Sequence, residues 1–203
     1  MSTSASKAAA SESTQSGSYT LLVTVGSTLF PELTNCILSS AILSILPSLG
    51  IKLVNVQYGK ADLLAHEEIE DLEIDAQGSG EFTWTDYNGA GQVNVHVFRY
   101  TNDLSKLIKE SDAVISHAGS GSILEVIRSK PLLVVPNSSL MDNHQAQLAD
   151  ALGDQGYLIS STVEQLDSKL ALLVKSIKQP LKPFPALDKA RFPVIVDQTM
   201  GFE

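Results

Sequence analysis

The stretch that decides the fold is Ala113-Val114-Ile115-Ser116-His117-Ala118-Gly119-Ser120-Gly121-Ser122-Ile123-Leu124-Glu125. Its apolar beginning predicts a short buried strand, and the apolar residues after the glycines predict a helix. A second apolar run at residues 132–135 leads into a polar loop at 141–145 and another helical pattern. Loops at the carboxyl ends of parallel strands are where open α/β sheets bind ligands. We therefore expect residues 112–145 to carry the ligand site of an α/β protein.

The turn between this strand and helix has the chemistry of an anion site. A helix that starts near Ser120 or Gly121 leaves its first N–H groups unpaired, and its dipole places about half a positive charge there. Gly119 and Gly121 let a ligand approach the backbone and permit positive φ, while Ser120 and Ser122 add hydroxyl donors. A phosphate or diphosphate suits this turn. The alternative is a tight turn in which Ser and Gly merely cap the helix.

Composition narrows the class of protein. The chain has 203 residues, of which 43% are hydrophobic, enough for one domain with a sizeable core. Its net charge of −9 disfavours nucleic acid as a partner. The excess acid is local, in a segment without Lys or Arg that we interpret as a solvated face and not a metal site. The acids of this segment are Asp62, Glu67, Glu68, Glu70, Asp71, Glu73, Asp75, Glu81 and Asp86.

The sequence also indicates a cellular compartment. Cys36 is the single cysteine, which excludes a disulfide within the chain and fits a reducing environment. The longest apolar stretch, residues 37–46, is too short to cross a bilayer. The first residues lack the pattern of a secretory signal. We therefore expect a cytosolic protein.

Three segments follow from the composition along the chain. Residues 1–18 are rich in Ser and Ala and predict a disordered tail. Residues 19–179 carry the alternating strand and helix patterns of one Rossmann-like domain. Residues 180–203 hold four of the eight prolines and end in apolar side chains. This extension is expected to dock on the domain or on another chain.

The strand and helix patterns predict a mostly parallel sheet with one antiparallel pair. Apolar runs at 19–25 and 51–56 predict buried strands, and Pro31 begins a single helix that continues to Ile45. Period-two alternation on both sides of Asn88-Gly89 predicts a β-hairpin. A loop is expected at 77–80, and Asn102 or Asp103 is expected to cap a short helix. The last strand is expected at residues 157–159.

Several familiar motifs are missing. The first strand is followed only by Gly26-Ser27-Thr28, so the G-x-G-x-x-G sign of a dinucleotide cofactor is lacking. The chain has neither a Walker A sequence nor a G-x-S-x-G elbow. The four histidines lack metal-ligand spacing. We expect neither a cofactor nor a metal.

The polar residues near the glycine turn suggest the ligand. His117, at the mouth of a strand, suits phosphate or sugar hydroxyls, although a histidine bound to loop backbone is the alternative. Glu125, one turn into the helix, can accept hydrogen bonds from ribose hydroxyls, or can be a surface carboxylate. Asn143, His144 and Gln145 bring donors and acceptors to a helix start beyond what capping needs. Together they indicate a nucleotide sugar.

These motifs also resemble a known family. The chain resembles the cytosolic subunits of the second N-acetylglucosamine transferase of dolichol-linked oligosaccharide synthesis. The resemblance is carried by residues 117–125, Lys130-Pro131-Leu132, Asn137 and residues 140–145. Leu181-Lys182-Pro183-Phe184-Pro185 resembles the yeast members. The resemblance covers roughly residues 19–203. More distantly, the chain is similar to the carboxyl-terminal half of the bacterial family 28 transferase that acts on a muramyl lipid.

The resemblance implies a fold and a reaction. The fold would be the Rossmann-like, donor-binding half of a GT-B glycosyltransferase. The chain would transfer N-acetylglucosamine with inversion from UDP-N-acetylglucosamine to N-acetylglucosaminyl-diphosphodolichol, for protein N-glycosylation. A membrane-anchored partner subunit would bind the acceptor at the cytosolic face of the endoplasmic reticulum. The chain alone would be inactive.

The resemblance also implies residue roles. Glu125 would bind ribose, the turn at 119–122 the diphosphate, and the second loop the sugar. The uracil would lie near Phe98 and Arg99, and His117 is a candidate general base, although the partner can equally supply it. The long tail and the Gly-rich segment 78–91 depart from the family pattern. The donor residues are Gly26, Ser27, Thr28, Phe98, Arg99, His117, Gly119, Ser120, Gly121, Ser122, Glu125, Asn143, His144 and Gln145.

Two other functions fit the residues. One is a non-catalytic nucleotide-sugar-binding or regulatory subunit. The other is a stand-alone Rossmann-like enzyme that acts on another phosphorylated substrate. Glu125→Ala should change ligand affinity without changing turnover in the first case, and the purified chain should turn over without a partner in the second.

Overall fold

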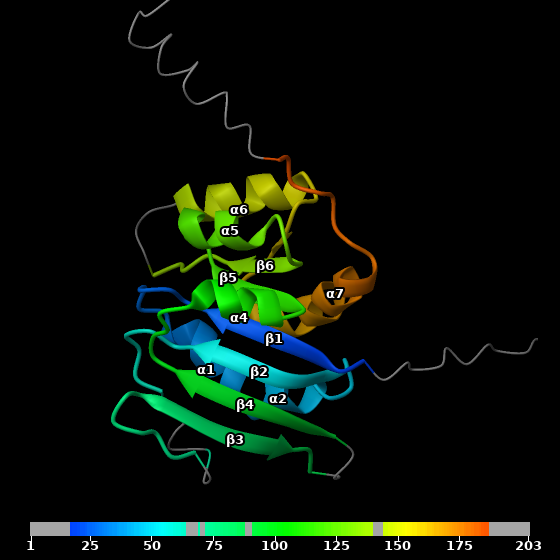
Figure 1. Cartoon of the computed structure of the whole chain (residues 1–203). Coiled ribbons are helices and arrows are strands. Elements are labelled where there is room, and N and C mark those ends of the chain that lie inside the picture. The colour runs from blue at the N-terminus through cyan, green and yellow to red at the C-terminus, as the bar shows by residue number, and fades with distance from the viewer. Residues whose placement is uncertain (1–16, 64–68, 70–71, 88–90, 140–143, 187–203) are drawn as a thin grey trace, which may run out of the picture.

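Seven strands form one mixed sheet with the order β3-β4-β2-β1-β5-β6-β7 (Figure 1). The computed structural model describes residues 17–63, 69, 72–87, 91–139 and 144–186. All neighbouring strands pair in parallel except β3 and β4. The strands are β1 (Tyr19–Thr24), β2 (Ile51–Gln57), β3 (Ser79–Thr85), β4 (Gln92–Phe98), β5 (Ala113–His117), β6 (Leu132–Val135) and β7 (Ile159–Ser160).

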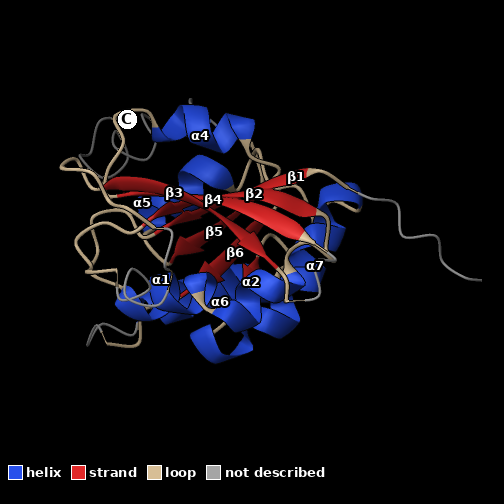
Figure 2. Ribbon diagram, turned by 90° about the horizontal axis from the view of Figure 1, so that it is seen from below, coloured by secondary structure: helices blue, strands red, loops and turns tan. Residues whose placement is uncertain are grey.

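Helices pack on both faces of this sheet (Figure 2). They are α1 (Pro31–Leu38), α2 (Ser40–Ile45), α4 (Leu104–Glu110), α5 (Ser120–Val126), α6 (His144–Asp154), the 3-10 helix η1 (Val163–Gln165) and α7 (Leu166–Lys178). Side chains of α1, α2 and α7 form one core with the strands, and side chains of α4, α5 and α6 form the other. The layers confirm the predicted α/β, Rossmann-like class.

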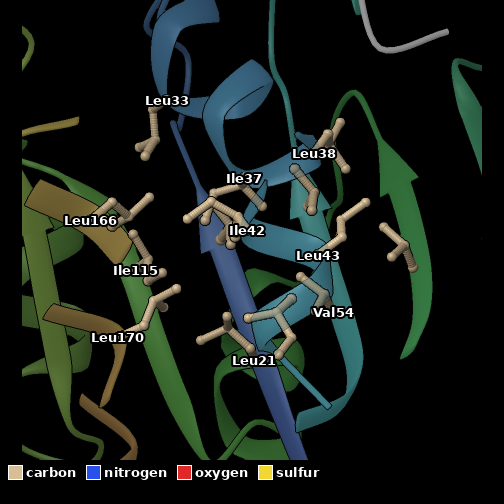
Figure 3. Close-up of a cluster of buried hydrophobic side chains, with 14 of the residues drawn as sticks. Leu21, Leu33, Ile37, Leu38, Ile42, Leu43, Val54, Ile115, Leu166 and Leu170 are labelled. Carbon is tan, nitrogen blue, oxygen red and sulfur yellow. The ribbon is translucent and has the colours of Figure 1, made fainter. Parts of the chain in front are cut away.

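The two cores explain why the central strands are apolar along their whole length. In β5, Ile115 belongs to the first core and Val114 to the second, so both faces of the strand are covered. Figure 3 shows the first core, where Leu21 and Ile115 lie with side chains of α1, α2 and α7. Burial on both faces removes the alternation that a half-exposed strand would show.

The antiparallel pair predicted on both sides of Asn88-Gly89 is confirmed by the pairing of β3 with β4, and residues 88–90 of the predicted turn lie outside the described residues. Phe82 lies opposite Val95, and both are buried, whereas Glu81 and Thr83 are exposed. The alternation in the sequence therefore reports one covered and one open face. β3 begins at Ser79, inside the segment 77–80 that was predicted to be a loop.

The early start of β3 has a local cause. Asp75 Oδ1 accepts hydrogen bonds from Gln77 N at 2.9 Å and from Ser79 N at 2.8 Å. Asp75 N donates to Ser79 O at 2.8 Å, which completes a tight turn. The turn is finished by Ser79, so the strand can start there and the predicted loop is shorter than expected.

The single helix predicted from Pro31 is wrong, because α1 and α2 are separated at Ser39. Ser39 has an extended backbone, with φ −67° and ψ 148°. Its hydroxyl donates to Cys36 O at 2.7 Å and accepts from Ile42 N at 3.4 Å. Serine competes with helical backbone in this way, so one side chain ends α1 and caps α2. The apolar periodicity continues across the break and hides it.

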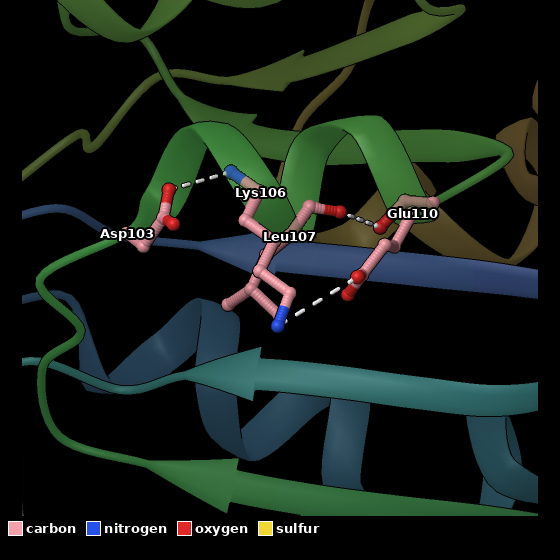
Figure 4. Close-up of polar contacts among 5 residues, drawn as sticks. Asp103, Lys106, Leu107 and Glu110 are labelled. Atoms are coloured by element: carbon pink, nitrogen blue, oxygen red, sulfur yellow. Dashed lines mark hydrogen bonds and ion pairs between the residues drawn. The ribbon is translucent and has the colours of Figure 1, made fainter.

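Two further predictions concern element ends. Asp103 is the cap of α4, since its Oδ1 accepts from Lys106 N at 2.9 Å (Figure 4). The last strand spans Ile159–Ser160, so it starts two residues later and ends one residue later than predicted, and it pairs with β6. The described helices include none long and apolar enough to cross a bilayer.

Candidate functional site

Three of the predicted site segments meet at one edge of the sheet. Gly26-Ser27-Thr28 follows β1, residues 117–122 end β5 and begin α5, and Arg99 follows β4. Because β1, β4 and β5 run in the same direction, their carboxyl ends share an edge, which is on the left in Figure 1. This edge also contains the topological switch point of the sheet, next to β1. From β1 the chain first adds β2 on one side and later adds β5 on the other.

The turn after β1 is tight and needs a glycine. Gly26 has φ +59°, a conformation that residues with a Cβ rarely adopt. Thr28 N donates to Val25 O at 3.1 Å, which closes the turn. Gln57 lies beneath it, and its Nε2 donates to Gly26 O at 3.3 Å. The turn is therefore held at a fixed height above the strand end.

His117 lies between two glycines. A Cβ added at Gly26 would come within 2.8 Å of His117 Cε1, and one added at Gly119 within 2.4 Å of Nε2. His117 is 7% exposed, and its Nδ1 is buried without a well-formed hydrogen bond to any described residue. The two glycines thus create the space that the imidazole ring fills.

Burial also decides the charge of this ring. Desolvation lowers the pKa of His117 below its ordinary value, and the nearby backbone of Thr24 opposes the shift only in part. The imidazole is therefore neutral at pH 7. A neutral ring has one donor and one acceptor nitrogen, so it can bind a hydroxyl or phosphate oxygen, or accept a proton.

α5 begins where the sequence predicted, at Ser120, with Gly119 as its N-cap. Ile123 N donates to Gly119 O at 3.0 Å, the first helical bond. Glycine permits positive φ at both positions, but neither residue uses it, since φ of Gly119 is −71° and Gly121 is not in that region either. Gly119 is small to admit the His117 ring, whereas a Cβ at Gly121 would meet nothing within 4 Å.

Glu125 is held by a residue that the sequence did not single out. Ser105 Oγ, on α4, donates to Glu125 Oε1 at 2.7 Å, across to α5. α4 is fixed by its Asp103 cap and by the bond from Ser111 Oγ to Leu107 O (Figure 4). The second carboxylate oxygen of Glu125 has no hydrogen bond recorded to the described residues, so the group can still accept from a ligand.

The second polar loop is partly described. Asn143 lies outside the described residues, and His144 is the first residue of α6. Gln145 follows it, and its buried Oε1 has no hydrogen-bond partner among the described residues. Gln145 lines a cavity of about 590 Å³ between the ends of β6 and β7, together with Asn137. Asn137 Nδ2 donates to Leu29 O at 3.0 Å and so joins this loop to the one after β1.

The predicted uracil contacts are less accessible than expected. Phe98 is 5% exposed, with its ring 5.3 Å from that of His96. The guanidinium of Arg99 lies 5.1 Å above the ring of Tyr58. Tyr100, the next residue, is 52% exposed. At this strand end, Arg99 and Tyr100 are therefore better placed than Phe98 to meet a ligand.

A different cavity lies away from this edge. It has a volume of about 330 Å³ and is lined by the residues before β6 and β7 and by the segment 180–184. Phe184 packs edge-on against Tyr157 and beneath Arg128. None of the predicted site residues lines it. The segment 180–184 therefore packs on the domain through Phe184 and forms one wall of this cavity.

Sequence reasoning missed the polar residues that support the site. Thr24 and Gln57 are buried, and each bonds to the backbone of a loop that carries predicted site residues. Asn137, which the sequence analysis named only as part of the family motif, is buried and does the same. Their signal was a polar side chain at the carboxyl end of an apolar strand. The described residues contain no group of three His, Cys, Asp or Glu arranged to hold a metal ion. The chemistry available is hydrogen bonding by a neutral imidazole, backbone N–H groups and a helix dipole.

Comparison with known proteins places these features in a family. The profile of the glycosyltransferase family 28 C-terminal domain matches residues 20–199. A protein of Cryptococcus neoformans named UDP-N-acetylglucosamine transferase subunit ALG13 is 48% identical over 197 residues, 91% of this chain and 98% of that protein. The subunit of the same name from Saccharomyces cerevisiae is 35% identical over 193 residues, 89% of this chain and 95% of that protein.

Solved structures agree with the fold. The NMR solution structure of ALG13 has a TM-score of 0.59 and 30% identity, and covers 88% of this chain and 94% of that one. The crystal structure of Acinetobacter baumannii MurG has a TM-score of 0.56 at 18% identity, and covers 90% of this chain but 50% of that one. These matches confirm the resemblance and the GT-B fold inferred from the sequence.

Proposed function

The chain belongs to the glycosyltransferase family 28 C-terminal domain family, and from this premise we propose that it is the donor-binding subunit of an inverting N-acetylglucosaminyltransferase. The donor is UDP-N-acetylglucosamine, and the acceptor is N-acetylglucosaminyl-diphosphodolichol. The product carries a β1,4-linked disaccharide, which is the second sugar step of lipid-linked oligosaccharide synthesis for protein N-glycosylation.

The observation that carries the proposal is the meeting of three elements at one sheet edge. The Gly26 turn, the neutral His117 and the start of α5 are in contact or consecutive. The relatives that share this chain over nearly their whole length are named as subunits of a UDP-N-acetylglucosamine transferase. An anion-binding turn beside a half-engaged carboxylate suits a nucleoside diphosphate linked to a sugar.

Each part of the donor has a proposed contact. The diphosphate lies against the N–H groups and hydroxyls of residues 119–122 and the turn 26–28. The ribose hydroxyls donate to Glu125, and the N-acetylglucosamine contacts the start of α6 through Asn143, His144 and Gln145. The uracil, expected from the sequence near Phe98 and Arg99, is placed at the more accessible Arg99 and Tyr100 of the same strand end. As UDP leaves, the helix start stabilises the charge on the diphosphate, a preorganised electrostatic contribution.

A general base must remove a proton from the acceptor hydroxyl. His117 is the candidate on this subunit, because burial keeps its ring neutral and able to accept a proton. Its 7% exposure places it deep beside the donor. A base on the partner would be free of that restriction. The pH–rate profile of His117→Asn, compared with the unsubstituted complex, decides between the subunits.

The second wall of the cleft comes from another polypeptide in this proposal. MurG is about twice as long as the part of it that this chain covers, and a GT-B cleft lies between two domains. We propose a membrane-anchored partner that binds the lipid acceptor. It would hold this subunit at the cytosolic face of the endoplasmic reticulum, and the C-terminal residues 194–203 are the first candidate for contact with it.

Reconstitution tests the proposal directly. The full chain and the membrane-anchored subunit from the same source are combined with radiolabelled UDP-N-acetylglucosamine and the lipid acceptor, and the lipid product is separated. We expect a disaccharide lipid from the complex and none from either subunit alone. UDP-N-acetylgalactosamine serves as the donor control. A complex that assembles but makes no product refutes the proposed reaction.

Variants of Glu125 separate catalysis from mere binding. Glu125→Gln keeps the shape of the side chain and one acceptor oxygen, whereas Glu125→Ala removes the side chain beyond Cβ and with it both acceptor oxygens. We expect the alanine variant to lose transfer activity together with donor affinity, and the glutamine variant to lose less. A loss of affinity with unchanged turnover in the complex would favour a regulatory nucleotide-sugar-binding subunit instead.

A further inference from the structure

A pair of buried polar side chains lies under the turn after β1. Thr24 and Gln57 are register partners at the ends of the parallel strands β1 and β2. Thr24 is 0% and Gln57 5% exposed. Burying an amide or hydroxyl without a hydrogen-bond partner costs free energy. Arrangements in which these two side chains keep their hydrogen bonds are therefore strongly favoured over arrangements in which the bonds are broken.

Their hydrogen bonds form a closed ring with Gly26. Thr24 Oγ1 donates to Gln57 Oε1 in a short hydrogen bond. Gln57 Nε2 donates to Gly26 O at 3.3 Å, and Gly26 N donates to Thr24 Oγ1 at 3.2 Å. Both backbone polar groups of Gly26 are therefore held by side chains of the two strands. Gly59 closes the turn from outside, since a Cβ there would lie 3.0 Å from Gly26 O.

The ring of bonds reaches His117 through Gly26. The Gly26 backbone borders the imidazole so closely that a Cβ would come within 2.8 Å of Cε1. Gly119 borders the ring on another side. A displacement of the Gly26 turn would therefore open or close the space in which the imidazole lies.

We infer that Gln57, acting with Thr24, is a positioning residue that fixes the Gly26–Thr28 turn against His117. Gln57 affects the His117 imidazole only through the Gly26–Thr28 turn and is not a catalytic residue. We call the three hydrogen bonds among Thr24, Gln57 and Gly26 the clamp. The Gln57 amide does not titrate, so the clamp keeps the same hydrogen bonds at any pH at which His117 changes charge. The inference rests on the proposed function only where the turn is said to touch the donor.

The test follows the imidazole by NMR in the full chain labelled at histidine, with His117→Asn to assign the signal. Gln57→Leu keeps most of the volume of the side chain and removes both amide bonds. We expect the titration midpoint of His117 to rise toward the value of a hydrated ring, about 6.5, with changed ring chemical shifts. Gln92→Leu, at an exposed glutamine on β4, is the matched control and should leave both unchanged.

A second pair of variants covers the case in which Gln57→Leu does not fold. Thr24→Val replaces the hydroxyl by a methyl group of similar size and should reproduce the His117 changes. Thr24→Ser keeps the hydroxyl and should restore the behaviour of the unsubstituted chain. The inference is overturned if folded Gln57→Leu or Thr24→Val leaves the His117 signal unchanged. It is also overturned if Thr24→Val and Thr24→Ser disturb the signal equally.

Transfer assays then link the clamp to activity. In the reconstituted complex we expect Gln57→Leu to lower kcat/KM roughly tenfold, the size of one lost hydrogen bond to a positioned group, with Gln92→Leu unaffected. The NMR result needs neither the donor nor the partner. A wild-type complex without transfer would therefore refute the proposed function and leave the clamp standing, whereas an unchanged His117 signal would refute the clamp alone.

Discussion

Replacing Gly119 with alanine tests whether the His117 ring is fixed by the two glycines that border it. The added Cβ would lie 2.4 Å from Nε2, far inside van der Waals contact. The backbone itself is not the obstacle, because φ −71° and ψ 126° suit alanine. His117 is 7% exposed and bordered by Gly26 on another side, so the ring has little room to retreat. The clash must therefore displace either the ring or the loop.

Overpacking of this kind costs about 1–3 kcal/mol. For a chain of this length, each kcal/mol corresponds to roughly 2–4 °C in Tm, so we expect Gly119→Ala to melt roughly 2–12 °C below the unsubstituted protein. Gly121→Ala is the matched control, since its Cβ would meet nothing within 4 Å and it lies inside α5. That change should be neutral or stabilise by up to about 1 kcal/mol.

Thermal melts give the Tm of both variants, and urea denaturation with an unchanged m-value gives the difference in the free energy of unfolding. Titration of the complex with UDP-N-acetylglucosamine then gives the donor affinity. Gly121→Ala should keep its stability and lose donor affinity in the complex, because its methyl group would enter open space beside the backbone N–H groups proposed to bind the diphosphate. Equal stability of Gly119→Ala and the unsubstituted chain would refute the steric argument. A Gly121→Ala variant with full affinity would refute the placement of the diphosphate.

Three more predictions follow from single contacts. Burial lowers the pKa of His117, so the unfolded chain binds a proton at a higher pH than the folded one, and stability present above about pH 6.5 should be lost as pH falls toward the folded pKa. His117→Asn should reduce the dependence of the unfolding free energy on pH, measured by urea denaturation at pH 5–7. An unchanged dependence would contradict this prediction. Ser105→Ala should change the free energy of unfolding by less than about 0.5 kcal/mol. It should still weaken UDP-N-acetylglucosamine binding in the complex, because Glu125 loses the hydrogen bond from Ser105; unchanged affinity would show that Ser105 does not support the site. Phe184→Ala should cost about 1–2 kcal/mol and speed proteolysis within residues 180–186, because the ring no longer packs on Tyr157; equal cleavage rates would show that the segment is held elsewhere.

Much of the fold could be read from local patterns. The structure has three elements where they were predicted: the strand run at 113–115, the helix start at Ser120 and the antiparallel pair of β3 with β4. Each depends on residues close in sequence. The helix break at Ser39 escaped because one hydroxyl overrode an apolar period that continues across it. The early start of β3 escaped because a single carboxylate, Asp75, completes the turn.

The candidate site shows the same division between local and distant information. The sequence identified His117, the glycines and Glu125 by type and spacing. It gave Gly119 the role of letting a ligand approach the backbone, and the structure adds a second reason for glycine there, because a Cβ would collide with the His117 ring. For Glu125 the sequence suggested ribose binding or a surface position and no protein partner, and the structure shows a hydrogen bond from Ser105, twenty residues earlier in the chain.

The sequence by itself determined the α/β class, the polar loop after β5 and the family resemblance, because hydrophobic period and motif spacing are local quantities. Only the tertiary structure decided which residues hold that loop in place. The register of β1 with β2 sets Thr24 against Gln57, thirty-three residues apart, and closes their hydrogen bonds on Gly26. Such a contact depends on the pairing of strands and on burial that removes competing water, and neither is written in the spacing of residues along the chain.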